Sequence, residues 1–235
     1  MQVTYIFLTY FLNMDELIKA LREKYIKDLT SSFSLYKVAI FLLFLVALVV
    51  VSERGNQSLW FEIASIQVNE ILSISSPFAS KILLLHLILG AVFTYFTGLF
   101  YKKIQSACFN LFASLRDFSG YMDRLHALIS QEVTKSNALN YYLVRDSKDE
   151  LKLRKSSLVQ IHIWGELILA SSIISLIGLS DFNIPDLLIG LSALVLTWFI
   201  QRSSFSYYIS KIAPALVVEG AFLDKTIEFG DSLDK

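Results

Sequence analysis

Four long runs of apolar residues dominate the chain, and segments richer in polar residues separate them. The runs are Leu35–Ser52, Pro77–Tyr101, Leu158–Leu179 and Leu187–Ile200. A helix of about 20 residues crosses a hydrocarbon core of about 30 Å, because each residue adds about 1.5 Å. Lys37 in the first run can extend its amine to the membrane surface, and the short fourth run requires tilting or extension through Gln201. The pattern predicts an all-α integral membrane protein with four transmembrane helices.

The composition supports a membrane protein. Of the 235 residues 54% are hydrophobic and 18% are charged, and the mean hydropathy is +0.55; a soluble domain has about a quarter of its residues charged. The net charge of zero gives no case for nucleic-acid binding, so we expect no direct nucleic-acid partner. The single cysteine, Cys108, excludes a disulfide within one chain and a cysteine-based zinc site.

The first residues, MQVTYIFLTYFLN, lack the charged start and the small-residue cleavage site of a signal peptide. We expect them to be mature sequence. Because this segment is too short to cross a bilayer, it should lie along the membrane surface or pack on the helical bundle.

The distribution of Lys and Arg predicts the orientation. Of the 21 such residues, only Arg54, between the first and second runs, and Lys81, near the start of the second run, belong to the predicted external side, and none falls between the third and fourth runs. Short segments rich in Lys and Arg remain on the cytoplasmic side of a membrane. We therefore expect a multi-pass membrane protein with both termini and the connection between the second and third runs in the cytosol.

This topology divides the chain into five segments. They are an N-terminal membrane-surface and amphipathic helical segment (1–34), the first two spans with the external loop 53–76 (35–101), a cytosolic helical stalk (102–157), a hairpin of the third and fourth spans (158–200) and a cytosolic C-terminal helical segment (201–235).

Local signals refine the helix boundaries. Asn13 and Ser147 are each followed three residues later by glutamate, a pattern typical of a helix N-cap, and the helix begun at Ser147 should run directly into the third span. A proline in the first turn predicts that the second span starts at Pro77. Gly120 predicts a bend or break, and Pro214 should kink or end the helix that extends the fourth span.

A face of regularly spaced residues runs along the second span and continues into the predicted stalk. Its members, which we call the seam, are Gly90, Thr94, Thr97, Tyr101, Ile104, Cys108, Leu111, Leu115, Phe118, Met122, Leu125 and Ile129. Small residues in lipid let helix backbones approach, and large apolar residues in water form a coiled-coil contact. The seam predicts one packing partner along its length. That partner is either a second copy of the chain, giving a homo-oligomer, or another helix of the same chain.

The third span carries ionisable residues. His162 and Glu166 are four residues apart, so they lie on one helical face in the inner half of the bilayer. In an antiparallel hairpin, Gln201 and Arg202 reach a similar level, which makes a contact between Glu166 and Arg202 reasonable. Such a polar cluster can be a structural lock, the lining of a pore or cavity, or a site of proton transfer. The sequence leaves these three interpretations open.

Motifs for catalysis are absent from the sequence. It has no P-loop, no dinucleotide glycine pattern, no HExxH and no GxSxG, and its three histidines are scattered. We expect no catalytic residues, no metal site, no cofactor and no enzymatic activity. The two halves are not similar, which argues against an inverted-repeat transporter.

In its layout of four spans and a long cytosolic connection, the chain resembles several bacterial membrane proteins. These are the membrane subunit of the Kiwa phage-defence type, four-span effectors of nucleotide-signalling defence systems and immunity proteins against pore-forming bacteriocins. The resemblance is one of topology and transfers no functional residue. It implies an oligomeric inner-membrane sensor or effector of antiphage defence with a cytosolic protein partner. The alternatives are an immunity protein and a small channel or proton-linked carrier that uses His162 and Glu166.

Replacing Gly90 and Thr94 by leucine is expected to disperse the predicted oligomer, because larger side chains hold helix backbones apart. The measurement is the mass of the purified protein in detergent and in lipid nanodiscs. An unchanged mass would count against an oligomer assembled through the seam.

Overall fold

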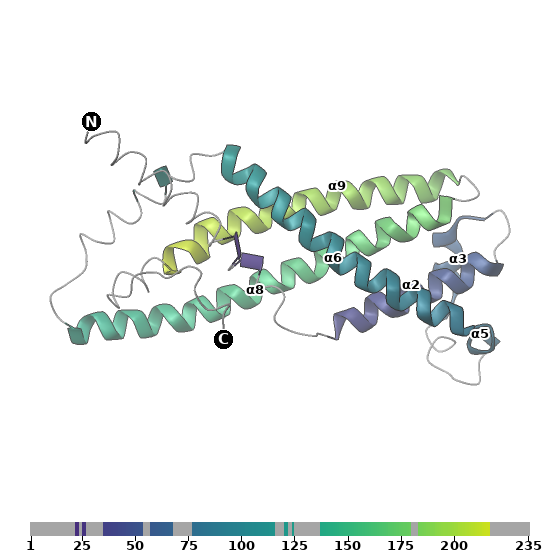
Figure 1. The fold of residues 1–235 in the computed structure, drawn as a ribbon, viewed down its shortest axis with the longest axis horizontal. Helices are drawn as coiled ribbons and strands as arrows, with labels where there is room; N and C mark the ends of the chain where they lie inside the picture. The colour runs from purple at the N-terminus through teal and green to yellow at the C-terminus, as the bar shows by residue number, and fades with distance from the viewer. Residues whose placement is uncertain are drawn as a thin grey trace, which may run out of the picture. The chain divides into compact units, whose positions relative to one another are not determined.

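A computed structural model of the chain describes residues 22–23, 25–26, 35–53, 57–67, 77–115, 120–121, 124, 137–179 and 183–216. Throughout these residues the regular structure is helical, which confirms the all-α class (Figure 1). The elements are α2 (Tyr36–Glu53), α3 (Leu59–Ser65), α5 (Pro77–Ser80), α6 (Leu84–Leu115), α8 (Asn137–Gly178), α9 (Ile184–Tyr207) and a π-helical segment, η2 (Tyr208–Ile212).

Four helices are long and apolar enough to cross a membrane, as predicted. They are Tyr36–Glu53, Leu84–Ser114, Glu150–Gly178 and Ile184–Leu216. The 18 residues of α2 extend about 27 Å, close to the thickness of a hydrocarbon core. The other three, with 31, 29 and 33 residues, are longer than a bilayer requires. The ends of α2 therefore give the best indication of where a bilayer would begin and end along the neighbouring helices.

The chain forms two compact units. Unit 1 comprises 1–31, 105–161 and 202–235, and unit 2 comprises 32–104 and 162–201. Helices α6, α8 and α9 each contribute residues to both units, because a border falls inside each of them. Unit 2 contains the predicted membrane segments almost entirely. The cytosolic location of unit 1 and the orientation of the termini stay predictions.

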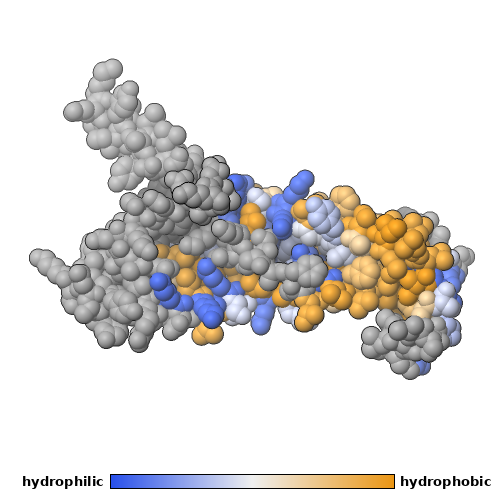
Figure 2. Space-filling model, turned by 60° about the horizontal axis from the view of Figure 1, so that its bottom comes forward, coloured by the Kyte–Doolittle hydropathy of each residue, from blue (hydrophilic) through white to orange (hydrophobic). Residues whose placement is uncertain are grey.

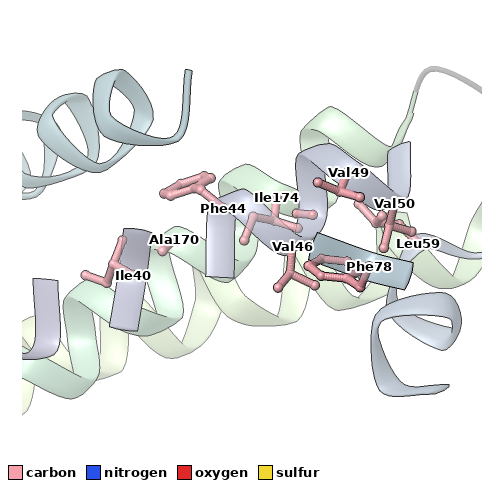
Figure 3. Close-up of a cluster of buried hydrophobic side chains, with 10 residues drawn as sticks. Ile40, Phe44, Val46, Val49, Val50, Leu59, Phe78, Ala170 and Ile174 are labelled. Atoms are coloured by element: carbon pink, nitrogen blue, oxygen red, sulfur yellow. The ribbon is translucent and has the colours of Figure 1, made fainter. Parts of the chain in front are cut away.

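The core of unit 2 is an apolar cluster between α2, α3, α5 and α8 (Figure 3). Its buried members are Ile40, Phe44, Val46, Ala47, Val49, Val50, Leu59, Phe78, Ala170 and Ile174. Phe44 also stacks on Phe93 of α6, with ring centroids 5.5 Å apart. In a bilayer such contacts stabilise through close packing, because lipid tails are as apolar as the side chains. The cluster forms the apolar contact between these four helices in unit 2.

Large apolar side chains on α6 and α9 are exposed within unit 2, among them Leu84, Leu85, Leu188, Val195 and Phe199. Figure 2 shows hydrophobic side chains gathered over part of the described surface. Apolar surface of this extent is unusual in a soluble monomer and is typical of a surface that faces lipid.

The core of unit 1 is aromatic. Tyr25, Phe109, Phe205 and Tyr208 are buried, and the ring centroids of Tyr25 and Tyr208 are 4.9 Å apart in an edge-to-face arrangement. Burial raises the pKa of Tyr25, and a hydrogen bond with Ser204 opposes this shift. Tyr25 belongs to the predicted N-terminal amphipathic helix, most of which lies outside the described residues. Its burial favours packing on the protein over exposure on the membrane surface.

Two predicted helix starts are wrong. The second span begins at Leu84, after the separate short helix α5 that Pro77 opens. The His86 Nδ1 atom accepts a hydrogen bond from the Leu83 backbone N–H at 3.3 Å and so caps the new start. The α8 helix begins at Asn137, so Ser147 lies inside it. Glu150 forms an ion pair with Arg154 one turn later, a contact that supports a helix interior.

The helix of the fourth span does not end at Pro214. It continues to Leu216, and the distortion lies just before the proline, in η2. A proline ring clashes with the carbonyl group four residues earlier in a regular α-helix, and the wider π-helical turn relieves such a clash. Arg154 Nη1 donates a hydrogen bond of 2.5 Å to the Lys211 carbonyl oxygen within this segment.

Asp186, in the first turn of α9, holds α3 in place. Its buried carboxylate accepts hydrogen bonds from Ser58 Oγ at 2.5 Å, from the Leu59 backbone N–H at 2.9 Å and from the Trp60 backbone N–H at 3.4 Å. Because the Ser58 side chain does not cap α3 itself, the carboxylate satisfies the N–H groups at the helix start. The Trp60 Nε1–H donates to Ser175 Oγ at 2.7 Å and adds a second attachment.

Asp186→Ala is expected to lower the free energy of unfolding by about 1 to 3 kcal/mol, because buried donors of Ser58 and Leu59 lose their acceptor. Thermal unfolding in detergent measures the loss. Ser192→Ala is the control, since the Ser192 hydroxyl is exposed and donates within its own helix. Equal melting temperatures of the two variants would contradict the role of Asp186.

Candidate intramembrane polar site

Unit 2 contains a group of polar side chains, four of them buried and Tyr36 partly buried, which we call the polar cluster: Tyr36, Tyr101, His162, Glu166 and Gln201. Tyr36 Oη donates a hydrogen bond of 3.0 Å to Glu166 Oε2. Tyr101 Oη and His162 Nδ1 share a hydrogen bond at the same distance. The exposed fractions of His162, Glu166 and Gln201 are 5%, 6% and 2%. Helices α2, α6, α8 and α9 thus all contribute a side chain.

Two glycines make room for the polar cluster. A Cβ atom at Gly165 of α8 would overlap with Tyr101 Oη of α6 and would lie 3.0 Å from Ile200 Cγ2 of α9. A Cβ atom at Gly98 of α6 would lie 3.3 Å from Glu166 Oε1 of α8. Each of the two helices therefore places a glycine opposite a polar side chain of the other. This reciprocal arrangement brings Tyr101 to His162.

Two buried atoms of the polar cluster have no hydrogen-bond partner in the described part of the chain, Glu166 Oε1 and Gln201 Nε2. Leaving a buried polar atom unpaired costs about 1 to 3 kcal/mol. A purely structural lock would be expected to satisfy its own atoms. Unpaired atoms in a native interior are explained by strain, by a functional role or by a bound water or ion.

The polar cluster lies near one end of the first span. Tyr36, the partner of Glu166, is the first residue of α2. Lys37 and Lys102 are the charged neighbours of the Glu166 carboxylate. At the other end of α2, Glu53 forms an exposed ion pair of 2.6 Å with Lys81. The sequence predicts that Glu166 lies in the inner half of the bilayer, and in the structure it contacts the first residue of the shortest span.

The predicted polar residues meet different outcomes. His162, Glu166 and Gln201 are all buried in unit 2. Arg202 is exposed and belongs to unit 1, so its pairing with Glu166 stays a prediction. The hydrogen bond to Glu166 comes from Tyr36, which sequence reasoning did not select. The available signal was a tyrosine at the end of an apolar run, where its hydroxyl can meet a polar group.

Four of the described seam positions are buried inside the chain. Gly90, Thr97, Tyr101 and Cys108 are buried, and a Cβ atom at Gly90 would lie 3.3 Å from Phe41 Cε2 of α2. These contacts favour the intramolecular alternative within unit 2, and a leucine at position 90 would meet α2 of the same chain. A seam contact with a second copy stays a prediction.

The remaining seam positions differ in their burial, and some lie outside the described residues. Thr94 and Ile104 are partly buried, and Leu111 is exposed. Leu115 is the last residue of α6. Four positions lie outside the described residues: Phe118, Met122, Leu125 and Ile129.

The chemistry available to the polar cluster is proton and hydrogen-bond exchange. Its phenol, imidazole and carboxylic groups can all bind or release a proton. Among the described residues, no group of three His, Cys, Asp or Glu side chains could hold a metal ion. The geometry therefore gives the most direct support to hydrogen-bond rearrangement.

Comparisons with protein-family models, with curated proteins and with solved structures gave no match to the chain. The fold and the polar cluster define the class by themselves. The chain is a multi-pass, all-α membrane protein in its described part, and a buried polar cluster joins its helices near one end of the first span.

Gly165→Ala is expected to lower the free energy of unfolding by about 1 to 3 kcal/mol, because the new methyl group displaces the Tyr101 ring. The matched control is Gly98→Ala, whose methyl group meets only the end of the Glu166 side chain. Both changes gain the same helix propensity of about 1 kcal/mol, so their difference isolates the contact. Thermal unfolding in nanodiscs measures it. A Gly165→Ala melting temperature equal to or above that of Gly98→Ala would refute the overlap.

Proposed function

We propose that the protein is an inner-membrane sensor or effector of bacterial antiphage defence, in which unit 1 receives a signal and unit 2 responds within the membrane. The observation that carries this proposal is the continuity of α8, whose 42 residues pass from unit 1 into unit 2 without a break. The α6 helix also passes between the units as one helix. A continuous helix transmits rotation and translation along its length, as in known switching proteins.

The polar cluster lies within unit 2, and two of its members are close along their helices to a unit border. His162 is the first residue of α8 in unit 2, and Tyr101 lies one turn of α6 before the border at 104/105. A movement of either helix from the side of unit 1 therefore acts first on the Tyr101···His162 hydrogen bond. The unpaired atoms of Glu166 and Gln201 offer new partners to a second arrangement. These features support a two-state response in the bundle.

The proposal includes a protein partner and self-association. The described start of α8 exposes Lys148, Glu150 and Lys152, a charged surface suited to a soluble partner. Exposed charged pairs contribute little to folding and more to the rate and choice of association. A homo-oligomer remains part of the proposal through exposed apolar surfaces of unit 2.

A small channel or proton-linked carrier is the second candidate. The observation in its favour is that His162 and Glu166 each pair with a tyrosine in the bundle. The apolar layer around Phe44 and Ile174 opposes a continuous polar path in the described arrangement. A response that opens this layer would connect the two candidates.

Tyr101→Phe tests the proposed response, because it removes the hydroxyl group bonded to His162 and keeps the ring. Loss of a hydrogen bond worth about 0.5 to 1.5 kcal/mol shifts a two-state equilibrium roughly 2- to 10-fold. In bacteria expressing the chain, we expect wild type to reduce phage plaque formation and to change dye uptake after infection. The variant should alter both responses at an unchanged protein level.

The matched control is Tyr95→Phe, since Tyr95 lies on the same helix and is 66% exposed. It should behave as wild type. Wild-type cells that neither resist any phage nor take up dye after infection would refute the defence function. A normal response of Tyr101→Phe would refute the role of the polar cluster in it.

A further inference from the structure

We propose that Glu166 is a proton-binding site, that it exchanges its proton with one side of the membrane only, and that this proton sets the contact between α2 and α8. The inference deepens the proposed function by naming a ligand of the polar cluster, and it rests on that function only for the biological use of the switch.

The two oxygen atoms of the Glu166 carboxylate have different surroundings. Glu166 Oε2 accepts the hydrogen bond from Tyr36, and the buried Oε1 atom, facing Gly98, has no partner among the described residues. Within unit 2, the described residues also provide no ion pair for this carboxylate. Oε1 is thus an available acceptor for a proton. A buried ionisable group near lipid is a functional candidate by its energetic cost alone.

Titratable and polar side chains from α2, α6, α8 and α9 surround Glu166. The α2 helix brings Tyr36 and Lys37, and α6 brings Lys102. On α8 itself, His162 is one turn away and is bonded to Tyr101. On α9, which packs on Gly165 through Ile200, the next buried side chain is the uncharged Gln201. No second carboxylate from the described residues is among these neighbours.

Protonation changes the contact between α2 and α8 directly. A hydronium ion from the medium transfers its proton to Oε1, a new O–H bond forms, and water leaves. The carboxylate becomes a neutral carboxylic acid, while the Tyr36 hydroxyl still faces Oε2. A hydrogen bond to a charged acceptor is roughly twice as strong as one to a neutral acceptor. Proton uptake therefore weakens the attachment of Tyr36 to α8.

The position of the apolar core determines from which side of the membrane Glu166 exchanges its proton. Beyond Glu166 on α8, the buried residues Ala170 and Ile174 join Ile40 and Phe44 of α2, with exposed fractions of 0%. In the other direction, Tyr36 begins α2 and follows Leu35, which is 89% exposed. A proton reaches Glu166 along the Tyr36 end without crossing the core. The opposite face of the membrane is sealed from the site.

Infrared difference spectroscopy of the full chain tests this proposal. In nanodiscs, where both faces meet the buffer, lowering the pH should produce a carboxylic acid C=O band that Glu166→Gln removes. Glu62→Gln on α3 should keep the band. Tyr36→Phe should keep it at a shifted frequency, because Tyr36 donates to Oε2. Absence of a band that depends on Glu166 would overturn the proposal, and Tyr36→Phe identifies the band independently if Glu166→Gln does not fold.

One-sided access is measured in proteoliposomes of uniform orientation. A pH jump on the face near Tyr36 should produce the Glu166 band, and a jump on the other face should not. A response to both faces, or to the other face alone, would overturn the sidedness. The test separates the two proposals: a band that depends on Glu166 beside a normal cellular response of Tyr101→Phe preserves the proton site and removes the proposed coupling. The absence of a band that depends on Glu166, together with an altered cellular response of Tyr101→Phe, would refute the proton site and preserve the coupling.

Discussion

The close approach of α6 and α8 at Gly165 and Gly98 is the constraint on which the polar cluster depends. Without a side chain at Gly165, Tyr101 reaches His162, and a Cβ atom at Gly98 would lie 3.3 Å from Glu166 Oε1. In lipid no hydrophobic force draws helices together, so small residues and interhelical hydrogen bonds carry the association. Here both occur at the same level, where α6 and α8 pass from one unit to the other.

The contact of Glu166 with the first residue of α2 bears on how a glutamate is tolerated in an apolar span. Glu166 lies beside the first residue of the shortest span, with Lys37 and Lys102 as charged neighbours. Near a membrane surface the cost of a charge falls, because water and flexible cationic side chains can reach it. The apolar core begins one turn further along α8, at Ala170. Within unit 2, the polar cluster therefore lies next to the apolar core.

Two local sequence signals did not set a helix boundary where the sequence predicts one. The capping pattern at Ser147 lies inside α8, where Glu150 pairs with Arg154 instead. Pro214 does not end its helix, because the π-helical turn before it accommodates the ring and Arg154 binds a carbonyl group there. A cap or a proline changes helix stability by about 1 to 3 kcal/mol, which packing along a long helix can exceed.

The sequence by itself determined the helical class and the four candidate spans, because length and hydropathy reflect the thickness of a bilayer. It did not determine the partner of Glu166 or the meeting of Tyr101 with His162. Those pairs join residues 130 and 61 positions apart. Only the tertiary structure decides them, because the periodicity of one helix fixes which side chains share a face and leaves open which helix that face meets.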